Sequence, residues 1–316
     1  MRARFLRIAI AALSLLAFAA QADYPERPLQ VIVPFAAGGG LDANARAFSQ
    51  ALGDELKTPV AVVNRDGAAG SIGLQALASA RPDGYTLAFT PAVSLTSEPH
   101  RLKTIAYRLE SFAPVCQVFD NIFAVIVPAA SPIRSVADLL DAARKQPGAI
   151  SYGTSGTGSI PHLGTADIEA AAKVQLTHVP YKGDGPMLQD LLAGRLGFGA
   201  MLASSVTGQI NAGVLRPIAV FSDRRHPNFP SVPTLTESGV PVVQLSFGGL
   251  LAPADTPPAA LATLQTACER AAKSATYAAW AQRAGQVVDY QPAARFAQKL
   301  REDSQAKAAT IKRLGL

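Results

Sequence analysis

The chain has 316 residues, of which 49% are hydrophobic, and a formal net charge of +6. This length suits two domains or one large one. The sequence contains no basic cluster with interleaved aromatic residues, so we expect no nucleic-acid partner. After residue 22 no apolar run approaches the roughly 20 residues that a membrane-spanning helix needs.

Residues 1–22 have the order of a secretory signal peptide. The stretch MRARFLR carries three arginines and no acid, the apolar run IAIAALSLLAFA follows, and residues 20–22 (AQA) form an A-x-A cleavage site. The apolar run is too short to span a membrane comfortably. We therefore predict a signal peptide over 1–22 and an exported, soluble mature chain that begins at Asp23. Without the three arginines its net charge is about +3.

The mature chain alternates short apolar runs with segments of helical periodicity. This pattern is typical of α/β layers around mostly parallel sheets. In the first part the predicted order is strand, helix, strand, helix, strand, at residues 29–35, 41–56, 59–65, 67–80 and 85–90. The fourth of these segments begins with a glycine-rich turn that feeds the helix. The connections are short, as in right-handed strand–helix–strand units.

The pattern restarts after Pro114. Predicted strands lie at residues 122–128, 151–153, 176–181, 196–202 and 217–221. Predicted helices lie at residues 135–146, 164–172 and 186–193. The tail over 258–316 is predicted to be mainly helical, because Ala, Leu, Gln and Lys are abundant in it.

Two glycine-loop units therefore sit in two halves of the chain. Segments near 114–121 and 222–233 are the natural crossovers between the halves, and the C-terminal helices would have to pack on the first half. We predict two lobes with a ligand cleft between them. The first lobe comprises residues 23–120 plus 222–316, and the second comprises residues 121–221.

The segment VIVPFAAGGGLDANAR (31–46) runs from an apolar strand through three glycines into a helix. Such a loop presents free backbone N–H groups at the positive end of the helix dipole, where an anion can bind. The loop Gly153–Gly158 meets the same conditions, and Ser155 and Ser159 add hydroxyl donors. Two such loops facing one another could clamp a carboxylate, although each could also be an ordinary tight turn.

Two side chains beside these loops allow two interpretations each. Asp42, in the first helical turn, either contacts the ligand or interacts favourably with the helix dipole. His162 follows Pro161 just after the second loop and is either near the ligand or a packing histidine.

A dinucleotide is an alternative occupant of the first loop. Gly38, Gly40 and Ala43 satisfy G-x-G-x-x-A, and residues 64–66 (NRD) end the second predicted strand. A chain that binds a dinucleotide in this loop would be an oxidoreductase. Export of the chain argues against this function, because free nicotinamide cofactors are scarce outside the cytoplasm. We expect no cofactor.

A serine hydrolase is a second alternative. Ser155 lies in a glycine-rich turn, but Thr157 stands where the G-x-S-x-G motif needs its second glycine. His178 and His226 lie downstream without a local motif that would make either a base. We therefore expect no catalytic residues.

Cys116 and Cys268 are the only cysteines. In an oxidising compartment they could pair, yet they lie 152 residues apart and both stand in apolar contexts, so we favour two buried thiols. Without a nearby histidine pair they give no metal site.

Seven segments together resemble one family. They are YPERPLQVIVPFAAGGGLDANAR (24–46), PVAVVNRDGAAGSIG (59–73), RPDGYTL (81–87), ISYGTSGTGSIPHL (150–163), HVPYKGDGP (178–186), LRPIAVFSDRRHPNFPSVPTLTESG (215–239) and GGLLAPADTP (248–257). They resemble the Bug or TctC-like extracytoplasmic solute receptors, the binding proteins of tripartite tricarboxylate transporters. The resemblance spans nearly the whole mature chain.

The resemblance implies a two-lobed periplasmic binding protein of the type II-like α/β class, which is not an enzyme. Such a protein holds a small carboxylate between its lobes and delivers it to the membrane subunits of a transporter, or to a sensor kinase. We expect a periplasmic monomer.

The resemblance also implies that the ligand carboxylate is held mostly by main-chain and hydroxyl donors of two loops. The implied ligand-binding residues are Phe35, Ala36, Ala37, Gly38, Gly39, Asp42, Thr90, Ser94, Thr154, Ser155, Gly156, Gly158 and Ser159. His162 and Ser204 complete the predicted ligand-binding set.

Two departures from the family pattern concern the ligand. Where the family often has Asp-x-Met-Phe-Asp/Asn, residues 197–204 read GFGAMLAS, which weakens the case for an amino acid with an ammonium group. Phe247 stands where the family often has Trp. Both changes leave the identity of the carboxylate open.

Overall fold

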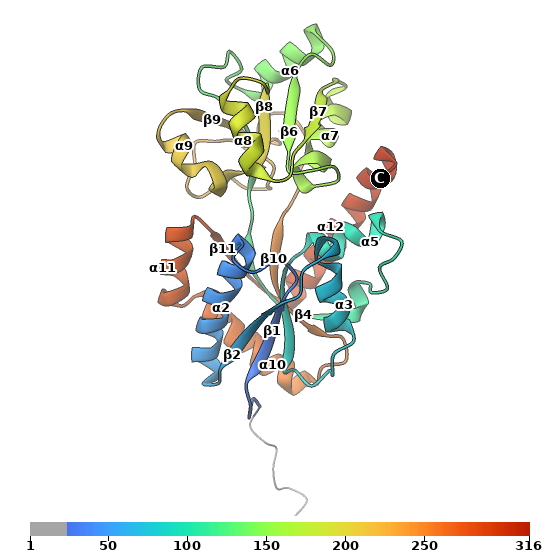
Figure 1. Cartoon of the computed structure of the whole chain (residues 1–316), viewed down its shortest axis with the longest axis vertical. Coiled ribbons are helices and arrows are strands. Elements are labelled where there is room, and N and C mark those ends of the chain that lie inside the picture. The colour runs from blue at the N-terminus through green and yellow to red at the C-terminus, as the bar shows by residue number, and fades with distance from the viewer. Residues whose placement is uncertain (1–23) are drawn as a thin grey trace, which may run out of the picture.

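The computed structural model describes residues 24–316, so the predicted signal peptide over 1–22 lies outside the described residues. The chain forms two lobes, one above the other in Figure 1, and each is built on one β-sheet flanked by helices. The predicted two-lobed α/β fold is confirmed. Within residues 24–316 no helix combines the length and the apolar character that crossing a bilayer requires.

The first lobe contains a six-stranded sheet in the order β11–β4–β10–β3–β1–β2. Its strands are β1 (Leu29–Val33), β2 (Val60–Asn64), β3 (Thr86–Pro91), β4 (Phe112–Asp120), β10 (Phe247–Pro253) and β11 (Val287–Pro292). Its helices are α2 (Gly40–Leu56), α3 (Ser71–Ala78), α4 (Val93–Thr96), α5 (Glu98–Arg101), α10 (Pro258–Ala272), α11 (Ala275–Ala284) and α12 (Ala293–Leu314), with short 3₁₀ turns η1 (Ala68–Gly70) and η2 (Leu109–Ser111).

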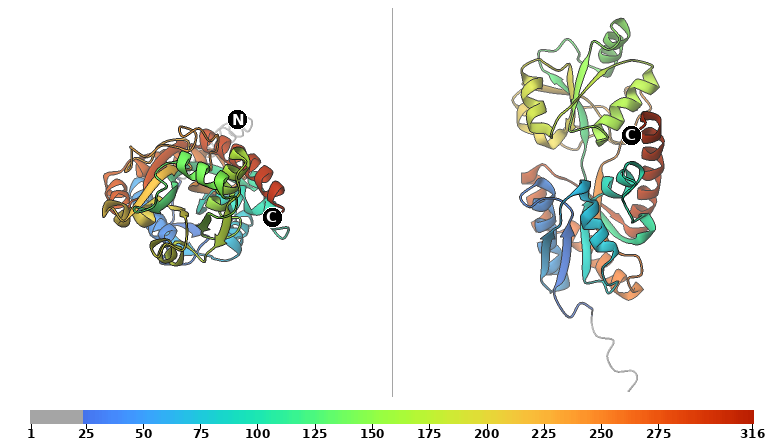
Figure 2. Two further views of the ribbon diagram at one scale, coloured as in Figure 1. Left: turned by 90° about the horizontal axis from the view of Figure 1, so that it is seen from above. Right: turned by 45° about the vertical axis from the view of Figure 1, so that its right-hand side comes forward.

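Both faces of this sheet are buried, which explains why its central strands are continuously apolar. Along β1, Val31 and Val33 pack with α2 and α10, whereas Ile32 packs on the opposite face with α3 and α12. Helices cover the two faces from both sides, as Figure 2 shows.

The second lobe contains a five-stranded sheet in the order β7–β6–β8–β5–β9. Its strands are β5 (Phe123–Pro128), β6 (Ser151–Thr154), β7 (Thr177–Pro180), β8 (Phe198–Leu202) and β9 (Leu215–Val220). Its helices are α6 (Val136–Lys145), α7 (Ile160–Ala172), α8 (Asp184–Leu192) and α9 (Thr207–Asn211), with a 3₁₀ turn η3 (Ala203–Val206).

The pairing within the sheets is mixed, which corrects the prediction of mostly parallel sheets. β1 pairs in parallel with β2 and β3, and β6 pairs in parallel with β7 and β8. By contrast, β10 is antiparallel to β3 and β4, β11 is antiparallel to β4, and β5 is antiparallel to β8 and β9. The reason is topological: β5 and β10 are the strands by which the chain arrives from the other lobe, and they run against their neighbours.

The tail over 258–316 is mainly helical, as predicted, but β11 interrupts it. The sequence analysis also recognised no strand at β4 or at β10. Burial of both faces removes the alternation that would mark these strands, and Gly248 and Gly249 lower the apparent strand propensity of β10.

The two crossovers between the lobes lie side by side. The first is the short link between β4 and β5, and the second precedes β10, where the backbone N–H of Asn121 donates to the carbonyl of Ser246 at 2.6 Å. Leu235, Val240 and Val242 pack into the core of the second lobe. The segment from 222 to about 242 therefore packs with the second lobe, although the sequence analysis assigned it to the first.

A cluster of two carboxylates and two cations lies beside this crossover bridge. Asp120 ends β4, Asp289 lies in β11, Lys299 lies in α12, and Arg224 comes from the segment after β9. Arg224 contacts Asp120 at 2.5 Å and Asp289 at 3.1 Å, and Lys299 contacts Asp120 at 3.4 Å. Gln117 donates to both carboxylates. Burial raises the pKa of the Asp120 carboxyl group, and the neighbouring cations Lys299 and Arg224 partly offset this rise.

Cys116 in β4 and Cys268 in α10 form a disulfide, so the sequence-based preference for two buried thiols is wrong. The two cysteines are far apart along the chain, but α10 packs directly on the face of the sheet that carries β4 and brings them together. Both side chains are fully buried in the core of the first lobe.

Removing this cross-link should destabilise the protein. We expect the double variant Cys116→Ala/Cys268→Ala to lose about 2–4 kcal/mol of unfolding free energy, because the disulfide restricts the unfolded chain. Urea unfolding with and without a thiol reductant measures the effect. The wild type should lose stability on reduction and the variant should not respond; identical wild-type midpoints under both conditions would contradict the pairing.

Candidate ligand-binding cleft

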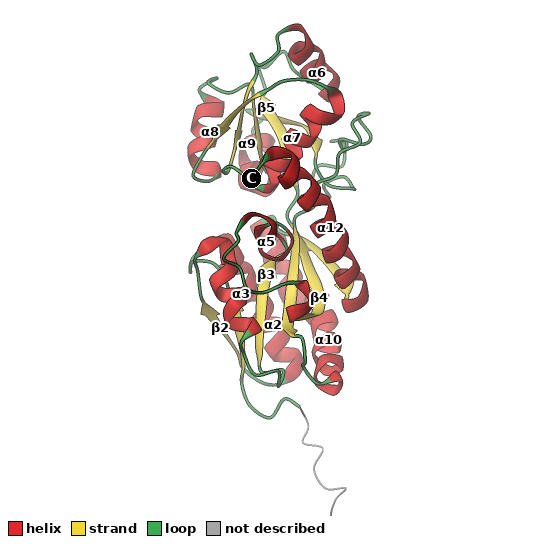
Figure 3. Ribbon diagram, turned by 90° about the vertical axis from the view of Figure 1, so that its right-hand side faces the viewer, coloured by secondary structure: helices red, strands yellow, loops and turns green. Residues whose placement is uncertain are grey.

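The predicted glycine loops lie where the two lobes face each other. In the first lobe β1, β2 and β3 are parallel, so the loops that follow them lie at one edge of the sheet, and this edge faces the second lobe in Figures 1 and 3. In the second lobe the loop after β6 faces the first lobe, because Arg101 of α5 reaches its Gly158. Ligand sites of α/β proteins lie at such carboxyl edges.

The first loop joins β1 to α2 and is exposed over residues 36–40. Gly38 has a φ of +81°, a left-handed conformation that favours glycine. Helix α2 begins at Gly40, and no side chain caps its N-terminus. Its first-turn N–H groups therefore have no side-chain acceptor in a cap.

Asp42 fixes this loop from within. Its Oδ2 accepts a hydrogen bond from the N–H of Gly38 at 2.9 Å and from Arg46 Nε at 3.0 Å, and its Oδ1 accepts from Asn64 Nδ2 at 2.9 Å. The side chain is only 5% exposed. The hydrogen bond from Arg46 lowers the pKa of Asp42 to about 2 despite burial, with help from Gly38 and Asn64. Asp42 thus shapes the loop, and its carboxylate oxygens are already occupied.

Thr90 and Ser94 lie behind the surface of the cleft. Both are buried, and Ser94 Oγ donates to the carbonyl of Ala69 at 2.9 Å. That carbonyl belongs to residues 67–70, a turn of four consecutive residues with positive φ, two of which are the alanines Ala68 and Ala69. The sequence predicts a glycine-rich turn here, but none of its residues was among the predicted site residues. Strained turns of this kind occur at ligand-binding sites, and Ser94 supports this one.

The second loop is held by hydroxyl groups that bond to it. Thr154 Oγ1 and Ser159 Oγ both donate to the carbonyl of Gly156, at 3.1 and 2.7 Å. These two hydroxyl protons are therefore used inside the loop. Ser155 Oγ makes no hydrogen bond with any residue in 24–316, so of the two predicted hydroxyl donors, Ser155 and Ser159, only Ser155 has no partner inside the loop.

Two stacked histidines support the second loop. The ring centroids of His162 and His178 lie 4.1 Å apart. His162 Nδ1 accepts the N–H of Gly158 at 3.0 Å, and Thr154 Oγ1 lies 2.7 Å from His178 Nε2. Burial, and then Arg101, lowers the pKa of His162; burial, and then His162, lowers the pKa of His178 to about 4.

Neither stacked histidine bonds to Ser155. Among the described residues His178 bonds to Thr154 and His162 bonds to Gly158. A nucleophile needs a base within hydrogen-bonding distance.

The two loops have the same local construction. Gly38 and Gly158 both have positive φ, at +81° and +77°, and each lies two residues before the helix that follows. In each loop the glycine N–H is accepted by the side chain four residues later, Asp42 or His162. His162 is therefore a structural counterpart of Asp42, which sequence reasoning did not recognise because the two acceptors differ chemically.

A cavity of about 230 Å³ between the lobes brings Gly40 together with Ser204. Its lining residues are Gly40, Leu41, Ala43, Asn44, Phe119, Asn121, Leu202, Ser204, Trp280, Ala284 and Gln286. Of the predicted site residues, only Ser204 lines this cavity. Trp280 and Gln286 come from the C-terminal tail, where no sequence signal tied them to the cleft.

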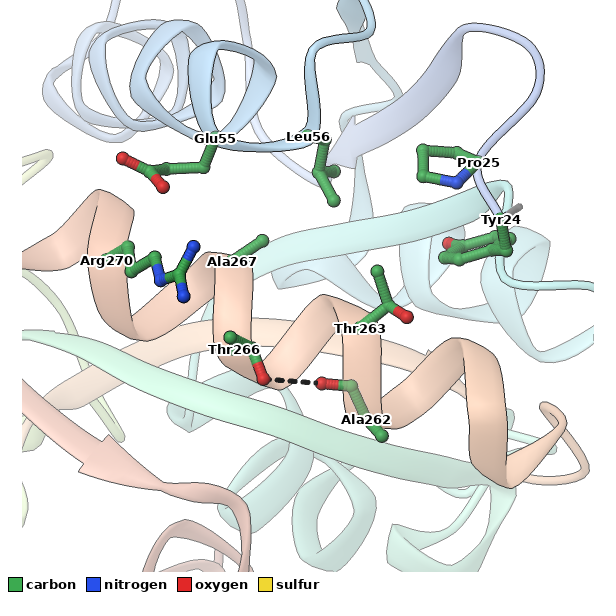
Figure 4. Close-up of a pocket in the computed structure, with 9 residues that line it drawn as sticks. All are labelled: Tyr24, Pro25, Glu55, Leu56, Ala262, Thr263, Thr266, Ala267 and Arg270. Atoms are coloured by element: carbon green, nitrogen blue, oxygen red, sulfur yellow. Dashed lines mark hydrogen bonds between the residues drawn. The ribbon is translucent and has the colours of Figure 1, made fainter.

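A second cavity, of about 420 Å³, lies away from these loops. Figure 4 shows Glu55 and Arg270 at one end of it and Tyr24 at the other, above helix α10. Tyr24 precedes β1, so this cavity lies at the edge opposite to the glycine loops. It takes no part in the candidate site.

The fold and the loops define the class of protein: a two-lobed α/β solute-binding protein with a glycine loop on each side of its cleft. The family model of the tripartite tricarboxylate transporter family receptor, TctC, matches residues 44–316. The chain therefore belongs to this family, and the resemblance found in the sequence is confirmed.

Individual relatives agree with this assignment. Protein BugT of Bordetella pertussis is 34% identical over 258 residues, which cover 79% of this chain and 78% of BugT. The structure of a TctC solute-binding protein from Polaromonas has a TM-score of 0.85 at 29% identity, over 92% of this chain and 99% of that chain.

Two similar structures come from Rhodopseudomonas palustris. One, solved with adipate, has a TM-score of 0.76 at 28% identity, over 93% of this chain and 99% of that chain. The other, MatC with bound malate, has a TM-score of 0.72 at 25% identity, over 91% of this chain and 100% of that chain.

Replacing Asp42 should loosen the first loop. We expect Asp42→Ala to lower the unfolding free energy by about 1–3 kcal/mol, because the Gly38, Asn64 and Arg46 donors lose a charged acceptor. Urea unfolding measures this effect. Asp54→Ala is the matched control, since Asp54 is an exposed aspartate on the same helix. Equal stabilities of the two variants would show that Asp42 does not hold the loop.

The stacked histidines should make stability depend on pH. Their pKa values are lowered in the folded state, so the unfolded chain binds more protons as the pH falls below about 6.5, and stability is lost towards about pH 4. Above pH 6.5 this contribution is complete and constant.

The double variant His162→Asn/His178→Gln tests this expectation. Asn can place an acceptor near the position of Nδ1, Gln can place a donor near the position of Nε2, and neither titrates in this range. Urea unfolding between pH 4.5 and 7.5 should show a weaker loss of stability for the variant than for the wild type. Parallel curves would contradict a role of these histidines.

Proposed function

We propose that this protein binds a small dicarboxylate between its lobes in the periplasm. The observation that carries the proposal is the pair of equivalent glycine loops, each leading into an uncapped helix N-terminus, α2 in one lobe and α7 in the other. N–H groups at such positions bind anionic oxygens. The neighbours solved with adipate and malate support a ligand with two carboxylates.

The ligand in this proposal lacks an ammonium group. The residues at the end of β8 that face the cleft include Leu202 and Ser204, which carry no negative charge. None of the residues that line the cavity is acidic, and the nearby Asp184 already accepts from Ser205 Oγ and the Leu202 N–H. A buried ammonium would therefore lack a counter-ion in the lining, and burying an unpaired charge is costly. We therefore infer a preference for plain dicarboxylates over aspartate or glutamate.

The proposed receptor is exported, acts as a monomer and is not an enzyme. It delivers its ligand to the membrane subunits of a tripartite tricarboxylate transporter, with a sensor kinase as the alternative partner. Membership of the TctC family supports the transporter. Closure of the lobes is driven by the ligand only to the extent that the closed form binds it better.

A thermal-shift screen of the chain from Asp23 tests this proposal. The probes are succinate, malate and adipate, with adipamide as the uncharged control for adipate and aspartate as the control for an ammonium group. A ligand at 100 times its Kd adds about 2.7 kcal/mol of stability. We expect shifts with dicarboxylates and none with adipamide. A shift with NADP alone, or equal shifts with adipate and adipamide, would overturn the proposal.

A further inference from the structure

We propose that Arg101 of the first lobe is a positioning residue for the ligand loop of the second lobe. Its Nη2 donates to the carbonyl of Thr157 at 3.4 Å, from across the cleft. Its guanidinium also lies against Gly158: a Cβ added at Gly158 would fall 2.6 Å from both Cζ and Nε. The inference rests on the proposed function only in identifying residues 154–159 as a ligand loop.

Glu98 holds the Arg101 guanidinium in place. Arg101 Nη1 contacts the two carboxylate oxygens of Glu98 at 3.0 and 3.2 Å. The Glu98 side chain is 5% exposed and that of Arg101 is 24% exposed. Burial raises the pKa of Glu98, and Arg101 opposes this rise. A planar guanidinium fixed by a buried carboxylate is a rigid support, unlike the solvated pairs that contribute little.

Gly158 is thus held from both lobes. Within the second lobe its N–H bonds to His162, and from the first lobe the Arg101 side chain covers its Cα. Glycine is required at position 158 for two reasons. Its φ is +77°, and the Arg101 guanidinium occupies the space that a side chain would need. The shape of the second loop therefore depends on where α5 lies, so a change in the angle between the lobes changes the loop.

The first test uses the charge of Arg101 and needs no ligand. Burial, and then Arg101, lowers the pKa of His162. NMR titration of the His162 ring should show its pKa rising in Arg101→Ala and staying low in Arg101→Lys, which keeps the charge. Arg108→Ala is the matched control, because Arg108 pairs with Glu110 on the surface of the same lobe. An unchanged His162 pKa in Arg101→Ala would overturn the proposal.

The second test is a double-mutant cycle between Arg101 and Gly158, read as the Kd for adipate. We expect Arg101→Ala to weaken binding about tenfold, a typical size for coupled residues. Gly158→Ala should weaken binding more in the wild type than in the Arg101→Ala background, where the clash with the guanidinium is gone. Strictly additive effects would contradict the cross-cleft contact.

The two tests separate this inference from the proposed function. If the wild type binds none of the dicarboxylates, the proposed function fails, while the His162 titration still decides whether Arg101 acts on the loop. If adipate binds with equal affinity to the wild type and to Arg101→Ala, the positioning role fails and the receptor function stands. Urea unfolding of each variant confirms that a loss of binding is not a loss of folding.

Discussion

The ion cluster at the crossovers is the interaction on which the arrangement of the lobes depends. Asp120 is the last residue of β4 before the chain crosses, and Arg224, which contacts it, belongs to the segment that packs with the second lobe. Breaking one partner of such a cluster would leave an uncompensated buried charge, which costs more than the pair contributes. The cluster therefore fixes where the two lobes meet, and with it the position of each glycine loop relative to the other.

A second connection between the lobes lies along α12. Thr310 donates to Asp167 of α7 at 2.9 Å, Arg313 pairs with the same carboxylate, and Gln244 donates to it at 2.7 Å. Figure 3 shows α12 extending from the first lobe to the second. Because α7 follows the second glycine loop directly, this contact acts on the same helix whose N-terminus faces the cleft. Any hinge motion must therefore pivot about α12 or break these bonds. Arg101 touches the second loop from the same side, because its helix α5 packs on α12, with His100 Nε2 2.8 Å from Ser304 Oγ.

The sequence predicted the strand–glycine–helix units, which are local patterns, but not the features that depend on contacts between distant segments of the chain. The strand–glycine–helix units were recognisable because loop geometry demands glycine at positions such as Gly38 and Gly158. The disulfide, β11 and the role of Arg101 were not recognisable, since each depends on segments far apart in the chain that the fold brings together. Asp42 is an intermediate case: the sequence placed it in the first turn of α2, but only the positions of Arg46 and Asn64 show that its carboxylate is occupied.

The two equivalent loops differ in the charge of their supporting acceptor, and this difference bears on how an anion is held. Asp42 carries a negative charge next to the first loop, which would repel a carboxylate if Arg46 did not pair with it. His162 supplies a neutral acceptor at the same position of the second loop, and Arg101 adds a positive charge nearby. The second loop therefore has the more favourable local field for an anion. The hydrogen bond that supports the second loop is also sensitive to pH. Once Nδ1 of His162 is protonated it cannot accept the Gly158 N–H, whereas Asp42 stays ionised down to a pH of about 2.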